Sequence, residues 1–350
     1  MMLSHLRVID LTQDLGRYTG KLLADLGADV LRIESGASTD VASLAWDSGK
    51  RLIALDPANS SDRQALRDLI RSADVLVRNC VAEPFTHEEL ATAHPRLIDI
   101  VIGAFAASSE RPATDLTLMA RSGLMAIVGD PDRAPMTLPG EQAFALAGAQ
   151  GAVAALTAVH ARHVDGKGQL VTVSALQSAV LANYREPLMW QFAGRVGRRT
   201  GNLLVRGKSG VRQIWSCRDG HVTWSLVDNP GMMRAMVKVM RERGMAADLT
   251  AIDWESTLIA DTPRETLAAW ESHVEAFFLA HTRAELTQWS VAHGLGLSQI
   301  DGVEDVLASE QLRSRDMWRE IARPGAASVA VPGPLFVTSE FDASNQGDVP

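Results

Sequence analysis

The stretch LRVIDLTQDLGRYTGKLLADLGADVLRIE at residues 6–34 decides the fold. Its opening LRVIDL is typical of a buried strand, and its closing DVLRIE is typical of a second strand. Between them, a loop with Gly16 leads into a leucine-rich helix that ends at Gly27. Strand, helix and strand within about 30 residues predict a βαβ unit with a right-handed crossover.

The alternation of strands and helices continues along the chain. Further strands are expected at residues 51–56 (RLIALD), 74–79 (DVLVRN), 97–102 and 169–173. A helix rich in Ala and Gly is expected from about Gln142 to His163, after a Pro- and Gly-rich loop at 129–140. We therefore predict an α/β fold with a doubly wound, mainly parallel sheet. Later segments predict a hairpin at 218–220, helices at 230–243, 263–281 and 283–293, and strand-like pieces within 323–339.

Composition excludes several classes of protein. The formal net charge of −8 over 350 residues argues against broad nucleic-acid binding, because neutralising phosphates needs clustered Lys and Arg. The two cysteines, Cys80 and Cys217, fit neither a disulfide framework nor a metal site, so we expect a reducing, cytoplasmic setting. The histidines form no metal-binding pattern, and no run of about 18 apolar residues predicts a membrane span.

Motifs spread over most of the chain carry a family resemblance. LRVIDLT and LLADLGADVLRIE are followed by RLIALD, ADVLVRN, ARHVDGKGQLVTVSALQS (161–178), DVLASEQLRSRDMW (305–318) and VPGPLF (331–336). In this order and spacing they resemble the type III (CaiB–BaiF) acyl-CoA transferases, which include formyl-CoA transferase and are related to the 2-methylacyl-CoA racemases. The resemblance implies a large Rossmann-like domain built from both chain ends, a smaller α+β domain, and an interlocked dimer. It places the large domain at 1–193 plus 305–341, a linker at 194–210, the small domain at 211–304 and a flexible tail at 342–350.

The resemblance also locates the catalytic position. Family transferases use an Asp that attacks the thioester and carries the acyl group, which is covalent catalysis. That Asp lies four residues before a Gly and eighteen before an Arg, which here are Gly148 and Arg162, so the position falls on Phe144. A phenyl ring cannot attack a thioester. Glu141, about one helical turn earlier, and Asp115 are the candidate substitutes.

Racemase chemistry is disfavoured by the same alignment. A racemase needs a base on each face of the carbon next to the thioester. The family's His–Asp pair aligns with Thr114 and Asp115, and its small-domain Glu aligns with Asn229. Of these three groups the chain keeps the Asp, as Asp115. Asp115 is better explained as a residue at a helix start than as a catalytic acid.

CoA-binding positions are partly retained. The resemblance assigns Asn79 and Cys80 at a strand end, and Gly201 and Asn202 before the second domain, to contact with CoA. Ser35 stands where the family often has a basic residue after the strand-end Glu. Arg32, Arg51 and Arg78 are the possible replacements. CoA or acyl-CoA is expected as substrate, and no bound cofactor or metal is expected.

Four functions remain open from the sequence. The first is a nucleophile-lacking subunit that works with an Asp-bearing paralogue on a carboxylic acid and its CoA thioester. The second is a homodimeric acyl-CoA enzyme that uses Glu141 or Asp115, and the third is a non-catalytic acyl-CoA-binding protein. A nicotinamide-dependent oxidoreductase is disfavoured, because Gly16 and Gly20 give G-x-x-x-G rather than G-x-G-x-x-G, although Glu34 is placed to hold a ribose.

Overall fold

The computed structural model describes residues 2–34, 41–79, 84–106, 109, 111–206, 209–323 and 325–334. They pack into two compact units. Unit 1 is drawn from Met1–Ala126, Met136–Gly197 and Ser309–Pro350, and unit 2 from Ile127–Pro135 and Arg198–Ala308. Unit 1 thus uses both ends of the chain, and a short loop from the first half of the chain belongs to unit 2.

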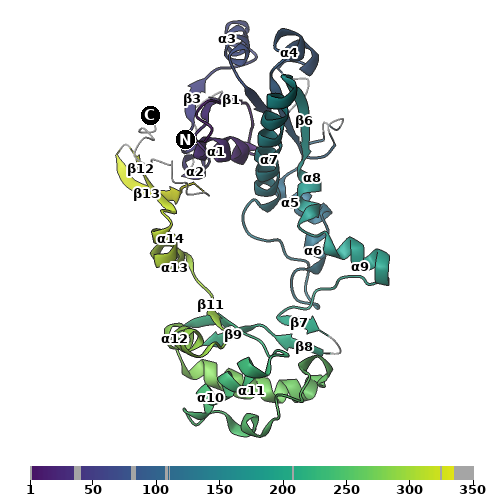
Figure 1. Cartoon of the computed structure of the whole chain (residues 1–350), viewed down its shortest axis with the longest axis vertical. Helices are drawn as coiled ribbons and strands as arrows, with labels where there is room; N and C mark the ends of the chain where they lie inside the picture. Colours follow the sequence, from purple (N-terminus) through teal and green to yellow (C-terminus); the bar gives the residue numbers. More distant parts are fainter. Residues whose placement is uncertain are drawn as a thin grey trace. The chain divides into compact units, whose positions relative to one another are not determined.

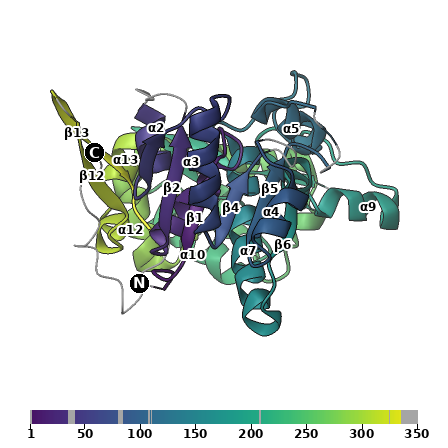
Figure 2. The ribbon, with the colours of Figure 1, turned by 90° about the horizontal axis from the view of Figure 1, so that it is seen from above.

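A six-stranded parallel sheet forms the centre of unit 1 (Figures 1 and 2). Its strands run in the order β3-β2-β1-β4-β5-β6. They span β1 (Arg7–Asp10), β2 (Asp29–Glu34), β3 (Arg51–Ala54), β4 (Val75–Arg78), β5 (Ile98–Gly103) and β6 (Gln169–Ser174). The order reverses between β1 and β4, where Val8 pairs with Val30 on one side and with Val75 on the other. This confirms the doubly wound α/β fold predicted from the sequence.

Helices cover both faces of this sheet because alternate strand residues point to opposite sides. Val8 and Val30 share a core with α1 (Arg17–Asp25), α5 (Asp115–Arg121), α7 (Gln142–Asp165) and α8 (Ala175–Leu181). Their neighbours Ile9 and Leu31 share another with α3 (Ser60–Arg71) and α4 (His87–Ala93). The other elements of unit 1 are α2 (Val41–Asp47), α9 (Arg185–Ala193), α14 (Glu310–Ser314), and the hairpin of β12 (Trp318–Arg323) and β13 (Ala326–Pro332). The short helix α6 (Leu124–Ile127) ends at the boundary with unit 2.

The long helix α7 packs closely on α1 through glycines (Figure 1). A Cβ at Gly148 would lie 2.6 Å from the Tyr18 Cβ, and one at Gly151 would lie 2.4 Å from the Thr19 Oγ1. The Thr19 hydroxyl donates to the Gly148 carbonyl at 2.9 Å. By length and composition alone α7 could cross a membrane, but 44% of its most apolar stretch is buried inside the protein. We therefore describe it as a core helix.

Unit 2 is built around a core of aromatic residues that includes Trp215, Trp224 and Phe278. The predicted hairpin at 218–220 is confirmed, with β9 and β10 paired across Asp219. The elements are β7 (Leu203–Arg206), β8 (Ser209–Arg212), β9 (Ile214–Cys217), β10 (Gly220–Thr223), α10 (Pro230–Arg241), η1 (Ala247–Ala251), η2 (Ile259–Asp261), α11 (Arg264–Ala280), α12 (Arg283–His293), β11 (Ser298–Gln299) and α13 (Val303–Ala308).

Local sequence did not indicate every element. The short helix α2 was not predicted, and β7 lies inside the segment expected to be a linker, where it pairs with β8. The three helices expected between residues 230 and 293 are confirmed as α10, α11 and α12. The tail expected at 342–350 lies outside the described residues.

Candidate functional site

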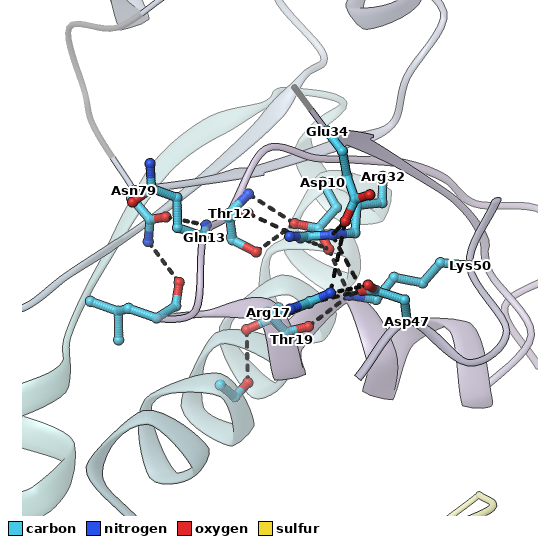
Figure 3. Close-up of polar contacts among 12 residues, drawn as sticks. Asp10, Thr12, Gln13, Arg17, Thr19, Arg32, Glu34, Asp47, Lys50 and Asn79 are labelled. Atoms are coloured by element: carbon cyan, nitrogen blue, oxygen red, sulfur yellow. Dashed lines mark hydrogen bonds and ion pairs between the residues drawn. The ribbon is translucent and has the colours of Figure 1, made fainter. Parts of the chain in front are cut away.

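The candidate site of unit 1 starts at the carboxyl ends of β1 and β4, where the strand order reverses and ligands bind in folds of this type. Asn79 follows β4 and holds the loop after β1 (Figure 3). Its side-chain oxygen accepts from the Gln13 amide at 2.7 Å, and its Nδ2 donates to the carbonyls of Leu15 and Ile102 at 2.8 and 2.9 Å. The Asn79 amide therefore fixes the loop that leads into α1.

Beside this loop lies a buried ion cluster (Figure 3), which we define by six side chains. They are the carboxylates of Asp10, Glu34 and Asp47 and the cations of Arg17, Arg32 and Lys50. Three positive and three negative charges leave the cluster neutral. Unpaired charges are costly to bury, so the balance is what permits this burial.

Contacts inside the ion cluster join four elements. Lys50 Nζ lies 2.9 Å from Asp10 Oδ2, 2.9 Å from the Arg17 carbonyl and 3.3 Å from Asp47 Oδ1. Arg17 forms a two-pronged pair with Asp47, which belongs to α2. Burial by itself would raise the pKa of Asp10, but Lys50, Arg32 and the hydrogen bond from Thr12 outweigh it and lower that pKa.

Arg32, a predicted CoA contact, is one of the six. Its side chain donates to the Thr12 carbonyl at 3.0 Å and to Glu34 at 3.1 Å, and it is 6% exposed. In this arrangement Arg32 stabilises the ends of β1 and β2. A role in holding a CoA phosphate stays a prediction.

The first turn of α7 carries Phe144, which the resemblance places at the family's nucleophile position. Phe144 is half-buried and packs against the core shared by β1, β5, α5 and α7. Its amide N–H donates to the Asp115 carboxylate at 2.9 Å. Asp115 begins α5, after Thr114 has capped that helix, so one carboxylate joins the starts of two helices. The positive end of the α7 dipole stabilises an anion at this place.

Glu141 directly precedes α7. Its side chain is exposed and makes no capping hydrogen bond to the first turn of α7. Phe144 and Asp115 thus come together, whereas Glu141 stays at the surface of the helix start.

The model of CoA-transferase family III matches residues 3–350.

The chain belongs to CoA-transferase family III.

Similar family members cover nearly the full chain. Subunit BbsE of succinyl-CoA:(R)-benzylsuccinate CoA-transferase from Thauera aromatica is 27% identical over 366 residues, 92% of this chain and 87% of the relative. Succinyl-CoA:mesaconate CoA-transferase from Haloarcula hispanica is 27% identical over 383 residues, 99% of this chain and 93% of the relative. A CAIB/BAIF family protein from Brucella suis has the same fold, with a TM-score of 0.84, 24% identity, and 99% and 94% of the two chains covered.

Several family motif residues have a structural use here. Arg162, at the end of α7, donates to the carbonyls of Asp74 and Arg96 and to the Asp74 carboxylate at 2.9 to 3.2 Å. A Cβ at Gly168 would lie 2.1 Å from the Leu97 carbonyl oxygen. These motif residues fix α7 and β6 at the amino edge of the sheet, away from the candidate site.

Two further predicted CoA positions lie in unit 2. Gly201 has a φ of +57°, and a Cβ there would approach Asp130 Oδ1 to 2.7 Å. Asn202 accepts from the Ile214 amide at 2.7 Å and donates to the Ile214 carbonyl at 2.6 Å. Both residues support the turn into β7. Cys80, the last predicted position, lies outside the described residues.

The alternative phosphate ligands are already paired. Arg51 begins β3, at the amino edge of the sheet, and pairs with Asp29 at 2.8 Å. Arg78 is buried and bonded to Asp99 at 2.6 and 2.8 Å. Within the described ranges no group of three His, Cys, Asp or Glu side chains is arranged to hold a metal ion.

Sequence reasoning missed most of the ion cluster. Asp10, Arg17, Asp47 and Lys50 were not singled out. They are spread over the chain from β1 to β3, so no local pattern marked them.

Proposed function

We propose that this chain is the nucleophile-lacking subunit of a heteromeric CoA transferase, which exchanges CoA between carboxylic acids. The observation that carries the proposal is the environment of Phe144. At the position of the family's nucleophilic Asp, a phenyl ring packs against the core and the backbone N–H is bonded to Asp115. The reactive Asp would then come from a related subunit.

The nearby acids fit poorly as substitutes. A nucleophilic carboxylate needs a lone pair free to attack the thioester carbonyl. Asp115 accepts a helix N–H with one oxygen and lies at a positive helix end, which stabilises the anion and lowers its reactivity. Glu141 is exposed, so water would compete for any acyl group that it carried.

A second chain is supported by a relative and by a surface. The relative in Thauera aromatica is named as a subunit of its transferase. In this chain, α9 has no buried residue, and Leu188, Trp190 and Phe192 are 51%, 59% and 93% exposed. Large clustered apolar side chains of this kind mark contact with another protein. We propose that an Asp-bearing paralogue covers them in an interlocked arrangement of the family type.

The domain bounds, the CoA contacts and the cellular setting expected from the sequence are part of the same proposal. We propose the large domain at 1–193 plus 305–341 and the small domain at 211–304. In the CoA site, we propose that Asn79 acts through the loop it holds. We also propose that the protein works in the reducing environment of the cytoplasm, because its two cysteines are too few for a disulfide framework.

One observation favours a second candidate, a homodimeric enzyme with altered chemistry. Asp115 accepts a hydrogen bond from the Phe144 backbone, so this acid lies at the family's catalytic position. A rotation of its side chain away from α7 would free the oxygen. Transfer of CoA by the pure homodimer, lost on Asp115→Ala, would favour this candidate over the first.

Co-expression tests the proposal. The chain is purified alone and together with an Asp-bearing paralogue, and transfer of CoA from succinyl-CoA to an acceptor acid is measured. We expect no transfer by the chain alone and transfer by the pair. The variant Phe144→Asp restores the carboxylate, and we expect it to give the chain alone measurable CoA transfer. Full CoA-transfer activity of the unmodified pure chain would contradict the proposal.

A further inference from the structure

A groove in unit 2 lies outside the site described so far. It has a volume of about 360 Å³ and runs between α10 and the segment from η1 to Glu255. Its apolar lining is made by Val237, Leu249, Ile252 and Trp254. Val237, Leu249 and Trp254 are each less than a tenth exposed, so the groove has a packed floor.

Three cations line one side of this groove. Arg234, Lys238 and Arg241 recur at i, i+4 and i+7 of α10, which places them on one face of the helix. Arg234 is paired with Glu255 across the groove. Lys238 and Arg241 make no ion pair with any residue that the structure describes. Two positive charges therefore remain available at the rim.

The acid at the rim, Asp253, offsets one of these charges and leaves a net positive charge. Its carboxylate accepts from the Glu255 amide at 3.1 Å and from the Ser256 hydroxyl at 2.7 Å. These bonds hold the carboxylate on its own turn. The groove thus keeps an excess of positive charge on the α10 side.

The floor contains an unpaired donor. Trp254 is 5% exposed, and its indole N–H has no acceptor among the described residues. Burying such a donor without a partner is unfavourable. An acceptor oxygen that entered the groove beside Trp254 would remove this cost.

We propose that this groove binds a small organic acid, with its carboxylate held by Lys238 and Arg241 and accepting from the Trp254 indole N–H, and its apolar chain over Leu249 and Ile252. Charge-assisted hydrogen bonds from the cations hold the oxyanion. The apolar lining then favours a carboxylate on a hydrocarbon chain over a bare phosphate. The site is separate from the transfer chemistry, and its test requires no transferase activity.

Titration of the full chain with hexanoate, inorganic phosphate and uncharged hexanamide tests the proposal. The readout is the indole N–H resonance of Trp254 in protein labelled with ¹⁵N-tryptophan, assigned with Trp254→Phe. We expect hexanoate to shift this resonance at lower concentration than phosphate does, and hexanamide to leave it in place.

A matched pair of double variants locates the binding. Lys238→Gln/Arg241→Gln and the control Arg133→Gln/Arg218→Gln remove the same charge from unit 2, and the control residues lie outside the groove. We expect the first pair to weaken hexanoate binding tenfold or more and the control to leave it unchanged. Equal weakening by both pairs, or a Trp254 resonance that none of the probes moves, would overturn the site. Binding of phosphate without hexanoate would overturn the assignment to an organic acid.

Discussion

Replacement of Lys50 by Met tests the ion cluster of unit 1. The Lys50 side chain is fully buried and makes its closest ionic contact with Asp10, which is also fully buried. Met keeps the length of the side chain but leaves three buried carboxylates facing two guanidinium groups. Breaking a buried pair in this way costs about 3–5 kcal/mol. We expect a loss of that size in the free energy of unfolding.

The adjacent residue provides the control. Arg51 pairs with Asp29 at 2.8 Å, but these side chains are 60% and 45% exposed, so Arg51→Met should cost less than about 1 kcal/mol. Both variants are compared by urea unfolding at pH 7, followed by circular dichroism.

A double variant distinguishes charge from shape. Lys50→Met with Asp10→Asn restores the balance of charge, so it should lose less stability than Lys50→Met alone. If Lys50→Met costs no more than Arg51→Met, the ion cluster is not the stabilising feature that we describe.

Three other predictions concern the fold and its pH dependence. Asp115→Ala removes the acceptor for the Phe144 amide and should lower the free energy of unfolding by about 1 kcal/mol. Asp115→Asn keeps an acceptor oxygen and should cost less. Thermal unfolding measures both variants. Gly148→Ala places a Cβ 2.6 Å from the Tyr18 Cβ and should cost about 1–3 kcal/mol in the same assay. The lowered pKa of Asp10 means that its charge contributes stability above the unfolded pKa near 3.8, and that this contribution is lost as the pH falls through the folded pKa. The stability difference between wild type and Asp10→Asn should therefore stay constant from pH 7 to about pH 5 and shrink below about pH 4, as urea midpoints would show; a difference that grows on acidification would contradict this.

The sequence predicted the sheet because each strand is marked by a pattern within its own few residues. Each strand is a short apolar run, and alternating residues such as Val8 and Ile9 fill the two cores on opposite faces. The Gly- and Ala-rich pattern of α7 likewise predicted close packing, which the contact of Gly148 with Tyr18 confirms.

Contacts between distant segments were not predictable in the same way. The Asp115–Phe144 bond joins residues 29 apart, and nothing near either residue indicates the other. The ion cluster needs Asp47, which sits on the unpredicted helix α2, to meet Arg17 from α1. Arg51 was a poor candidate for a ligand contact because it starts its strand, and starts of parallel strands lie at the edge opposite the ligand side.

We propose that this chain carries no acyl group itself. Hydroxylamine trapping during turnover of the chain with an Asp-bearing paralogue, read by peptide mass spectrometry, tests it most directly. We predict a hydroxamate on the paralogue's aspartate and unmodified Glu141 and Asp115 in this chain. A hydroxamate on either of these two residues would contradict the account.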